Sequence, residues 1–476
     1  MATSRARKRS VRAAAPGGPG AYARCLESIA RRRRFGMRPG LETIRVLLEA
    51  LDHPELAFRS IHVTGSKGKG SVTALAASVL GAAETRVGRY TSPHLVSYRE
   101  RIQVDGVSIP PSAVVDGVGR IEEATARLLR SGALEREPTF FEVTTALAFD
   151  WFRHEEVGAA VVEVGIGGRL DATNVLDSAV GVITTVELEH VEVLGSTLTA
   201  IAGEKAGILR PGMVAVVGEP KAEPLEEIHR RAGPMGVPVW HLGRELVLGE
   251  RTLGGWGQSF DLLTPHASYP ALRVPLHGIA QAGNAALAVA AVERFQEVLD
   301  RPLREVDVRK GLRAVEWRGR LERFGKAPEG WLDVAHTPES ARLLAQSLAE
   351  INPLADPSGN AIVFGCLGDK RVDEILEALS PLAETLVIAP VRSARGMATG
   401  TVQRNAAGRF PRIVIAPDVG QAWRLARVAA DTDGFVLATG SDYLVGELIG
   451  IEEGRPGGEP DLSDPGVSGD PAGAPP

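Results

Sequence analysis

One short segment near the start of the chain constrains its fold more than any other part of the sequence. Residues 60–64 form a short apolar run, residues 65–71 read Gly-Ser-Lys-Gly-Lys-Gly-Ser, and an Ala- and Leu-rich stretch follows. In a strand–loop–helix unit of this kind, the glycines let backbone N–H groups turn toward a phosphate. The helix then presents its positive N-terminus, and a lysine reaches the β and γ oxygens. A glycine-rich structural turn is the plainer interpretation, but it does not account for the lysine. The segment predicts a loop that binds nucleotide phosphates.

The length and composition favour a globular protein with two domains. The chain has 476 residues, which is too many for one ordinary core, and its net charge of −5 gives no electrostatic basis for binding nucleic acid. No stretch approaches the roughly 20 apolar residues that a membrane span requires. The two cysteines, Cys25 and Cys366, allow neither a disulfide framework nor a cysteine metal cluster. We expect no nucleic-acid partner, no membrane partner and a cytoplasmic location.

Alternating apolar runs and helical patterns predict an α/β fold. Most of the runs are β-branched and are bounded by glycine or turn residues, as in parallel sheets with helices on both faces. They lie at 60–64, 159–164, 180–185, 213–217, 361–365, 385–389, 413–416 and 434–438. A segment richer in Gly, Thr and Ser, at 240–276, predicts antiparallel strand and loop.

The sequence divides into four parts. Residues 1–20 are basic and rich in Ala, Gly and Pro, and residues 453–476 carry almost no large apolar side chains, so both are expected to be disordered tails. Between them, a predicted helix at 284–299 ends at Asp300-Arg301-Pro302, which indicates a hinge. We therefore expect a larger N-terminal domain at 21–300 and a smaller C-terminal domain at 301–452.

Three ionisable residues stand near the ends of predicted elements in the first domain. Glu163 ends a buried apolar run, where a carboxylate is costly without a partner. That partner is either Arg169, in a structural ion pair, or Mg²⁺ beside the phosphates, since magnesium takes carboxylate oxygens and few protein ligands. His190 follows a later strand in a loop, either as an ordinary packed or exposed histidine or as a ligand of a second metal. Lys205 is the second residue of a predicted helix that opens at Glu204 and stops at Pro211-Gly212. Its amine either pairs with a neighbour or takes up CO2 to become an anionic ligand.

A series of short segments, in a fixed order, covers most of the chain. The segments are Arg34–Glu42, Gly65–Ser71, Thr91–Leu95, Arg99–Ile102, Thr139–Glu142, Glu163–Asn174, Glu189–His190, Glu204–Ile208, Asn284–Ala286, Gly319–Arg320, Leu332–His336 and Thr439–Ser441. Each is a weak signal alone, but their shared order and spacing are highly specific. From about residue 22 to about residue 450, the chain resembles folylpolyglutamate synthase/dihydrofolate synthase. That family belongs to the wider Mur-ligase group of ATP-dependent amide-forming enzymes.

The resemblance implies both a fold and an activity. The fold has two Mur-ligase-like domains: a P-loop ATPase domain with a mostly parallel sheet, and a smaller Rossmann-like α/β domain at the C-terminus. The activity is ATP-dependent ligation of L-glutamate to the carboxylate of dihydropteroate or of a reduced folate, through an acyl phosphate. Both acceptors use the same chemistry, so we expect a bifunctional enzyme. The resemblance further implies Mg²⁺ at two sites, leaves room for a monovalent cation, and suggests a monomer.

The resemblance also implies roles for individual residues. The ATP site is expected to comprise Gly65, Gly68, Lys69, Gly70, Ser71, Asn284, Arg320, Asp333 and His336. The expected metal ligands are Ser92, Glu163, His190 and Lys205, the last as a carbamate, and Lys69, His190 and Lys205 are the expected catalytic residues. The expected folate pocket comprises Thr139, Phe140, Phe141, Glu142, Leu170, Asp171 and Ala172. There the rings can stack on a flat heterocycle while Asp171 accepts from its N–H groups. Core packing is the alternative for Phe140 and Phe141.

Four positions depart from the commonest family pattern. Lys67 stands in place of Asn, Glu189 in place of Asp, Thr337 in place of Asn, and Arg318 in place of Pro. None of these changes removes a group that the chemistry requires, but they bear on metal geometry and substrate preference. Because the implied ATP contacts come from both sides of the hinge, we expect the domains to close on binding and to keep water from the acyl phosphate.

Three other functions are alternatives to the folate ligase. The first is a ligase of the same fold that acts on a UDP-sugar cell-wall precursor, and the folate-type segments argue against it. The second is a regulatory or scaffold protein that binds a nucleotide without catalysis. The joint presence of Lys69, Glu163, His190, Lys205 and Asp333 argues against that. The third, a P-loop motor on nucleic acid, is disfavoured by the acidic charge.

Overall fold

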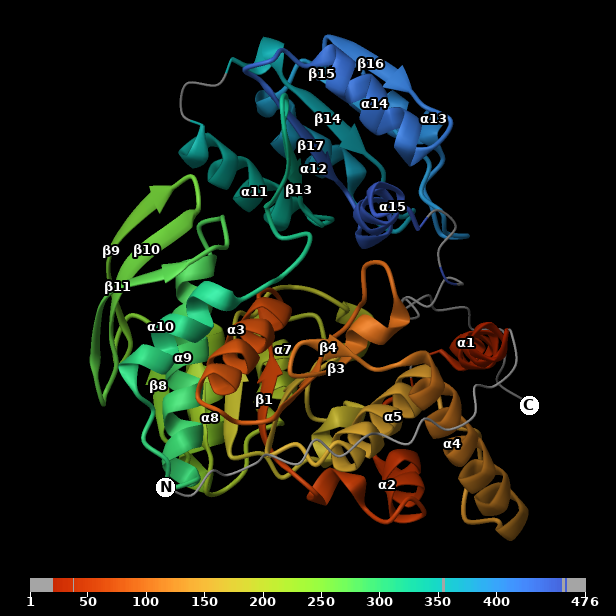
Figure 1. Cartoon of the computed structure of the whole chain (residues 1–476), viewed down its shortest axis with the longest axis vertical. Coiled ribbons are helices and arrows are strands. Elements are labelled where there is room, and N and C mark those ends of the chain that lie inside the picture. Colours follow the sequence, from red (N-terminus) through yellow and green to blue (C-terminus); the bar gives the residue numbers. More distant parts are fainter. Residues whose placement is uncertain (1–19, 37, 353–355, 456–458, 460–476) are drawn as a thin grey trace, which may run out of the picture.

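The computed structural model describes residues 20–36, 38–352, 356–455 and 459 (Figure 1). Helix α1 (Ala21–Arg31) begins where the N-terminal domain is expected to begin. Residues 1–19 of the first predicted tail lie outside the described residues, as does most of the second. Within the second tail, Glu459 accepts hydrogen bonds from the hydroxyls of Tyr22 and Ser97, so this tail is held at one point.

The N-terminal domain is built on an eight-stranded sheet with the order β4-β3-β2-β5-β1-β6-β7-β8. Its strands are β1 (Arg59–Thr64), β2 (Val87–Tyr90), β3 (Ile102–Val104), β4 (Val107–Ser108), β5 (Ala159–Glu163), β6 (Val180–Ile183), β7 (Val214–Val217) and β8 (Val239–His241). Strand β3 is antiparallel to both of its neighbours, β2 and β4, and all other neighbours pair in parallel. The four strands predicted in this domain are confirmed as β1, β5, β6 and β7.

Helices cover both faces of this sheet. On one face lie α3 (Lys69–Ala82), α9 (Gln281–Val298) and α10 (Glu305–Ala314), which share one apolar core. On the other face lie α1, α2 (Glu42–Glu49), α4 (Pro111–Ser131) and α5 (Phe140–His154). The short α6 (Val191–Leu194), α7 (Leu198–Ala206) and α8 (Ala222–Ala232) pack beside β6 and β7. Among the described helices, none is both long enough and apolar enough to cross a membrane.

A separate antiparallel sheet follows β8, as the composition of residues 240–276 predicts. It consists of β9 (Val247–Gly254), β10 (Gly257–Leu263) and β11 (Ser268–Val274), in the order β11-β10-β9. Side chains such as Phe260 and Leu272 join the core under α9, and Figure 1 shows this sheet beside α9 and α10. It is therefore an extension of the N-terminal domain.

The predicted domain boundary at residue 300 is too early. Residues 299–304 are only a connection to α10, whose Val308 and Leu312 lie in the same core as α3. Contact with α3 is close, because a Cβ at Gly311 would lie 2.4 Å from Val79 Cα. The second sheet begins at Glu322, so we place the boundary between Ala314 and Glu322.

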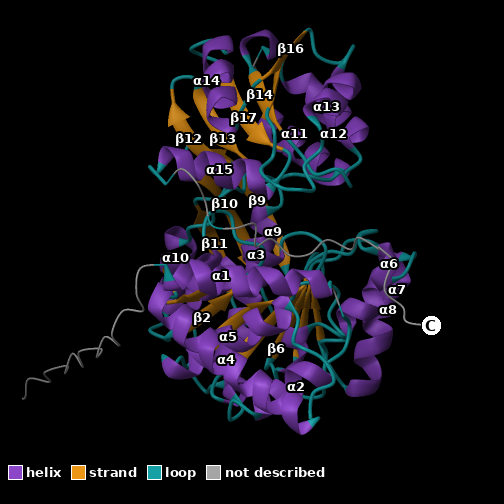
Figure 2. Ribbon diagram, turned by 90° about the vertical axis from the view of Figure 1, so that its right-hand side faces the viewer, coloured by secondary structure: helices purple, strands orange, loops and turns teal. Residues whose placement is uncertain are grey.

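The C-terminal domain is a six-stranded sheet between two layers of helices (Figure 2). Its strand order is β12-β13-β17-β14-β15-β16, and only β12 is antiparallel to its neighbour. The strands are β12 (Glu322–Lys326), β13 (Glu329–Leu332), β14 (Ala361–Phe364), β15 (Thr385–Ile388), β16 (Arg412–Ile415) and β17 (Phe435–Thr439). The helices are α11 (Pro338–Ile351), α12 (Val372–Leu379), α13 (Thr399–Ala406), α14 (Val419–Ala429) and α15 (Asp442–Glu452). The four strands predicted in this domain are confirmed.

One loop of the first domain docks into the second. Leu95 and Val96, which follow β2, pack against the C-terminal core. The approach is closest at α15, where a Cβ at Gly446 would lie 2.0 Å from the carbonyl oxygen of Leu95. The loop that carries Ser92 is therefore held by the C-terminal domain.

Candidate functional site

The predicted phosphate loop connects β1 to α3, and its backbone takes conformations that favour glycine. Gly65 and Gly68 have φ angles of +145° and +85°. A Cβ at Gly65 would lie 1.8 Å from Thr184 Oγ1, and this hydroxyl donates to the carbonyl of Lys67 at 2.5 Å. Lys69 Nζ donates to the carbonyl of Gly65 at 2.8 Å. The end of β6 thus fixes the loop, and Lys69 lies over it.

Two side chains from distant parts of the sequence close around this loop. Asn284 Oδ1 lies 2.6 Å from the position of a Cβ at Gly68, and Trp317 Cζ2 lies 2.5 Å from the position of a Cβ at Gly70. Neither glycine could carry a side chain without displacing these groups. Asn284 was predicted at this site, whereas Trp317 was not.

Glu163 and Ser92, both predicted metal ligands, meet next to the loop. Glu163 Oε2 accepts a hydrogen bond from Ser92 N at 3.1 Å, and it lies 3.4 Å from the position of a Cβ at Gly70. Arg169, the alternative partner for this carboxylate, pairs with Glu204 at 2.8 Å. The Glu163 carboxylate therefore lies at the first turn of α3, where the phosphates of a nucleotide would lie.

The other two predicted metal ligands, His190 and Lys205, are linked through Glu189. Lys205 is completely buried, and its Nζ lies 2.9 Å from Glu189 Oε1. Burial lowers the pKa of Lys205 to about 8. Burial acts to raise the pKa of Glu189, but the ammonium groups of Lys205 and Lys69 outweigh it and lower that pKa to about 2. His190 begins α6 with a φ of +48°, and burial lowers its pKa. The unmodified amine of Lys205 thus pairs with a neighbour.

The prediction that a helix opens at Glu204 is wrong. Lys205 lies in the last turn of α7, which starts earlier, at Leu198, after a cap by the Thr197 hydroxyl. The helix ends at Ala206, and a Cβ at Gly207 would lie 2.3 Å from Arg169 Cβ. The chain leaves the helix there because it passes against the loop that follows β5.

Asp333 and Arg320 lie together in the C-terminal domain. Asp333 accepts hydrogen bonds from the backbone N–H groups of Leu321 and Ala335, both at 2.8 Å. Burial raises the pKa of Asp333 to about 6, and the charge of Arg320 opposes that rise. Asp333 thus holds the turn that carries Arg320.

His336 lies on the side of the C-terminal domain that faces the phosphate loop. Its Nδ1 lies 2.8 Å from the carbonyl oxygen of Val334, which fixes the ring. Burial lowers the pKa of His336 to about 4, and the positive charge of Lys67, on the loop, contributes to that decrease. The structure thus places predicted ATP contacts from both domains toward one another.

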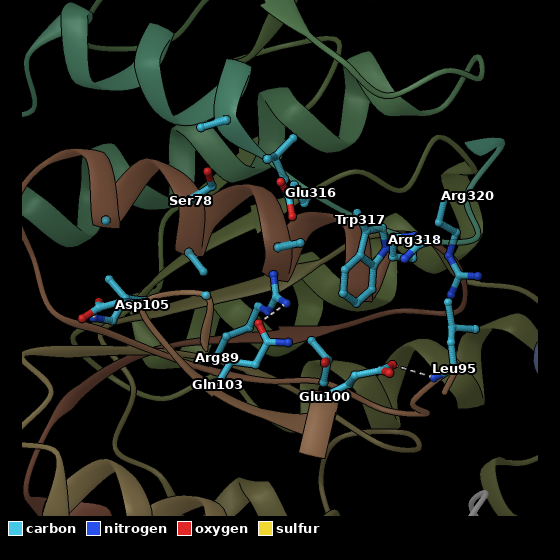
Figure 3. Close-up of a pocket in the computed structure, with 18 of the residues that line it drawn as sticks. Ser78, Arg89, Leu95, Glu100, Gln103, Asp105, Glu316, Trp317, Arg318 and Arg320 are labelled. Atoms are coloured by element: carbon cyan, nitrogen blue, oxygen red, sulfur yellow. Dashed lines mark hydrogen bonds between the residues drawn. The ribbon is translucent and has the colours of Figure 1, made fainter. Parts of the chain in front are cut away.

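A cavity of about 570 Å³ is lined by residues of both domains (Figure 3). Its walls come from α3, β2, the segment 91–95, α10 and the linker 314–320, and Asp442 belongs to the C-terminal domain. In Figure 3, Arg89 points toward Trp317, and its Cζ lies 5.3 Å from the centre of that ring. Arg320 also lines this cavity. Arg89 was not predicted, because it belongs to no recognisable sequence motif.

A second, smaller pocket of about 130 Å³ contains six of the seven predicted folate contacts. These six are Thr139, Phe141, Glu142, Leu170, Asp171 and Ala172. The exception is Phe140, which is completely buried in the core with its ring under the guanidinium of Arg101 at 5.2 Å. For Phe140, the alternative of core packing is correct, because neighbouring positions on a helix face different directions.

Further residues that line the same pocket were not predicted from the sequence. Gly36, Arg38, Pro39 and Gly40 line it, and all four lie in the segment Arg34–Glu42 that the resemblance includes. Glu204 lines it as well. That segment was the only sequence signal that could have revealed Gly36, Arg38, Pro39 and Gly40, but the resemblance assigned no function to it.

Metal ligands in this site are few. In the part of the chain that the structure describes, no group of three or more His, Cys, Asp or Glu side chains is placed to hold a metal ion. The candidates are the Glu163–Ser92 pair and the set formed by Glu189, His190 and Lys205. Such a donor set fits Mg²⁺, which keeps several waters and takes phosphate oxygens alongside one or two carboxylates.

Comparison with known proteins agrees with this geometry. Residues 63–292 match the Mur ligase middle domain, and residues 319–442 match the Mur ligase glutamate ligase domain. The dihydrofolate synthase/folylpolyglutamate synthase of Mycobacterium tuberculosis is 38% identical over 384 residues, which is 78% of each chain.

Solved structures show the same relationship. Folylpolyglutamate synthase of Mycobacterium tuberculosis, complexed with ADP and AMPPCP, has a TM-score of 0.83 and 35% identity, covering 91% of this chain and 99% of its own. Escherichia coli FolC in complex with DHPP and ADP has a TM-score of 0.79 and 28% identity, covering 92% and 99%. The chain belongs to the dihydrofolate synthase/folylpolyglutamate synthase family of Mur ligases, enzymes that use ATP to join glutamate to a folate.

Proposed function

We propose that this chain ligates L-glutamate to the carboxylates of both dihydropteroate and reduced folates, with ATP as the phosphoryl donor. One observation carries the proposal: the Glu163–Ser92 pair lies at the first turn of α3, directly after the phosphate loop. Groups of the C-terminal domain approach the same region, since the charge of Lys67 on this loop acts on His336. The relatives that match are folate enzymes, which favours this reading over a UDP-sugar ligase or a scaffold.

The reaction proceeds in two steps at the phosphate loop. The acceptor carboxylate attacks the γ-phosphoryl group of ATP, forming an acyl phosphate and releasing ADP. The amine of L-glutamate then attacks the acyl carbon, and inorganic phosphate leaves with the oxygen that came from the carboxylate. Lys69 and the loop N–H groups stabilise the charge that builds on the transferring phosphoryl group. Asn284, Arg320, Asp333 and His336 complete the ATP site from both domains.

Mg²⁺ would be held at two places by the residues present. Glu163 and Ser92 serve the first, beside the phosphates, and His190, Glu189 and Lys205 serve the second. The ions would neutralise charge on the phosphoryl oxygens. A further monovalent cation, a monomeric state and a cytoplasmic location stay predictions.

The second metal site is best explained by a carbamate on Lys205. The ammonium first loses a proton; the neutral amine then attacks CO2, an N–C bond forms and a second proton leaves, so the cation becomes an anion. Burial favours the neutral amine, since it lowers the pKa of Lys205. The product would place two anions, the carbamate and Glu189, side by side, and a divalent cation would offset their repulsion.

The smaller pocket suits the pterin ring. Phe141 supplies an aromatic face and Asp171 a buried acceptor, and Thr139 and Glu142 form a capping box that fixes the start of α5. Arg136 pairs with Glu142 at 2.8 Å and holds that carboxylate.

The test of this proposal is acceptor-dependent phosphate release with MgATP and L-glutamate. We expect release with dihydropteroate and with tetrahydrofolate, each giving a product heavier by one glutamyl residue in the mass spectrum. Turnover with only one acceptor would assign the chain to that single step. Absence of turnover with both, from folded protein that binds ATP, would contradict the proposed substrate class.

A further inference from the structure

Three buried side chains form a hydrogen-bonded chain that runs from the central sheet to the smaller pocket. His62 Nε2, on β1, lies 2.8 Å from Thr173 Oγ1, and Thr173 Oγ1 lies 2.5 Å from Asp171 Oδ1. His62 and Thr173 have no exposed surface, whereas Asp171 lines the pocket with 8% of its surface exposed. His62 therefore touches the pocket only through the other two.

The direction of these hydrogen bonds follows from the number of protons. An ionised Asp171 can only accept, so the Thr173 hydroxyl gives its single proton to Oδ1. The oxygen of Thr173 then accepts from His62, which places the ring proton on Nε2. Burial lowers the pKa of His62 to about 3, with a further decrease from the charge of Arg210, so the ring is neutral. Within the described residues, His62 Nδ1 has no hydrogen-bond partner, as this tautomer allows.

The chain fixes the orientation of the carboxylate. Oδ1 accepts from the hydroxyl of Thr173 and from its backbone N–H at 3.0 Å, while Oδ2 accepts from Ile166 N at 3.1 Å. A backbone hydrogen bond from Gly165 also acts on this carboxylate. The protein thus holds Asp171 from several sides, and its small exposed surface faces the pocket. Burial raises the pKa of Asp171, and the two hydrogen bonds from Thr173 oppose that rise.

We propose that His62 and Thr173 are positioning residues, which hold Asp171 ionised and correctly oriented to accept N–H groups from a flat heterocycle in the pocket. The inference rests on the proposed function, since it takes the pterin ring as that heterocycle. It adds two residues that lie 111 positions apart in the sequence and that have no role in the proposed ATP and metal sites.

The first test removes the hydroxyl in the middle of the chain. Thr173→Val keeps the side-chain shape and the backbone N–H to Oδ1, and Thr173→Ser is its matched control because it keeps the hydroxyl. We expect Thr173→Val to raise the Kd for dihydropteroate about tenfold, the loss typical of one hydrogen bond to a charged group. The KM for ATP and kcat at saturating acceptor should stay within about twofold, since the phosphate loop is untouched. Thr173→Ser should bind like the natural protein.

The second test asks whether His62 acts through Thr173. His62→Leu removes the donor, while His62→Gln keeps an N–H near the place of Nε2 and should restore binding. In the double variant, His62→Leu should add nothing to Thr173→Val, because the connection is already broken. Thermal melting of every variant confirms that the compared proteins are folded. If Thr173→Val is unstable, the comparison of His62→Leu with His62→Gln takes its place as the test.

The outcomes separate this inference from the proposed function. If Asp171→Asn leaves dihydropteroate binding unchanged, or if the natural protein does not bind dihydropteroate, the pterin pocket itself is wrong and the inference is overturned with it. If Asp171→Asn weakens binding while Thr173→Val does not, only the positioning role is overturned. Additive losses in the double variant, or equal increases in the KM of all three substrates, would also overturn it.

Discussion

Replacement of Lys205 with alanine is expected to slow ligation by about 10²–10³-fold, the range seen when one group that stabilises transition-state charge is lost. The physical reason is the proposed second metal site. Without the carbamate, only Glu189 and His190 would hold the cation that we propose to stabilise the phosphoryl group. Initial rates with MgATP, dihydropteroate and L-glutamate measure the effect.

Lys205→Arg separates the carbamate from an ordinary ion pair. Arginine keeps a positive charge beside Glu189, where Lys205 Nζ lies 2.9 Å from Oε1, but its guanidinium stays protonated and does not react with CO2. We expect Lys205→Arg to be as slow as Lys205→Ala, and acetate to restore part of the activity of Lys205→Ala by supplying a carboxylate. An active Lys205→Arg protein would show that the ion pair, and not the carbamate, is what catalysis requires.

Substitution of Gly446 with alanine is expected to lower ligation by about 10–100-fold, which corresponds to the roughly 1–3 kcal/mol cost of overpacking a close contact. A Cβ at this position would lie 2.0 Å from the carbonyl oxygen of Leu95, and a backbone atom cannot move aside as a side chain can. The C-terminal domain would then shift away from the loop that carries Ser92. Arg320, Asp333 and His336 would lose their positions opposite the phosphates.

Gly450→Ala is the matched control for this variant. Gly450 lies one turn later on the same helix, α15, and a Cβ there would meet only Arg455 O at 3.4 Å and Val96 Cγ1 at 3.7 Å. Both changes gain the same helix propensity, so any difference between them reports the contact with Leu95. Equal activity of the two variants would mean that docking of this loop is not needed for ligation.

Much of the fold follows from local signals in the sequence. Most of the parallel strands of both sheets could be predicted from short β-branched runs bounded by glycine, because such runs suit strands that are buried on both faces. The strand–loop–helix shape of residues 60–82 was predictable as well, since the glycines at 65 and 68 take positive φ angles that other residues rarely adopt. Its role in binding phosphate stays a prediction. The antiparallel sheet of β9, β10 and β11 was predictable because residues 240–276 are richer in Gly, Thr and Ser than the rest of the domain.

Other features depend on tertiary contacts that local pattern does not contain. Phe140 and Phe141 are adjacent and chemically identical, and only the way α5 packs sends the first into the core and the second into the pocket. The domain boundary was placed too early, because a Pro near residue 302 marks the end of α9 but not the end of a core. His62 was read only as part of a strand, since its partner Thr173 lies far away in the sequence.

The most direct test of the ligation chemistry is an isotope transfer. Dihydropteroate with ¹⁸O in its carboxylate would be incubated with the protein, MgATP and L-glutamate, and the inorganic phosphate analysed by mass spectrometry. Attack of the carboxylate on ATP followed by attack of the amine on the acyl carbon must leave one ¹⁸O in each phosphate released. We expect that label, together with the glutamylated product. Product formation with unlabelled phosphate would contradict the acyl phosphate and the site built around it.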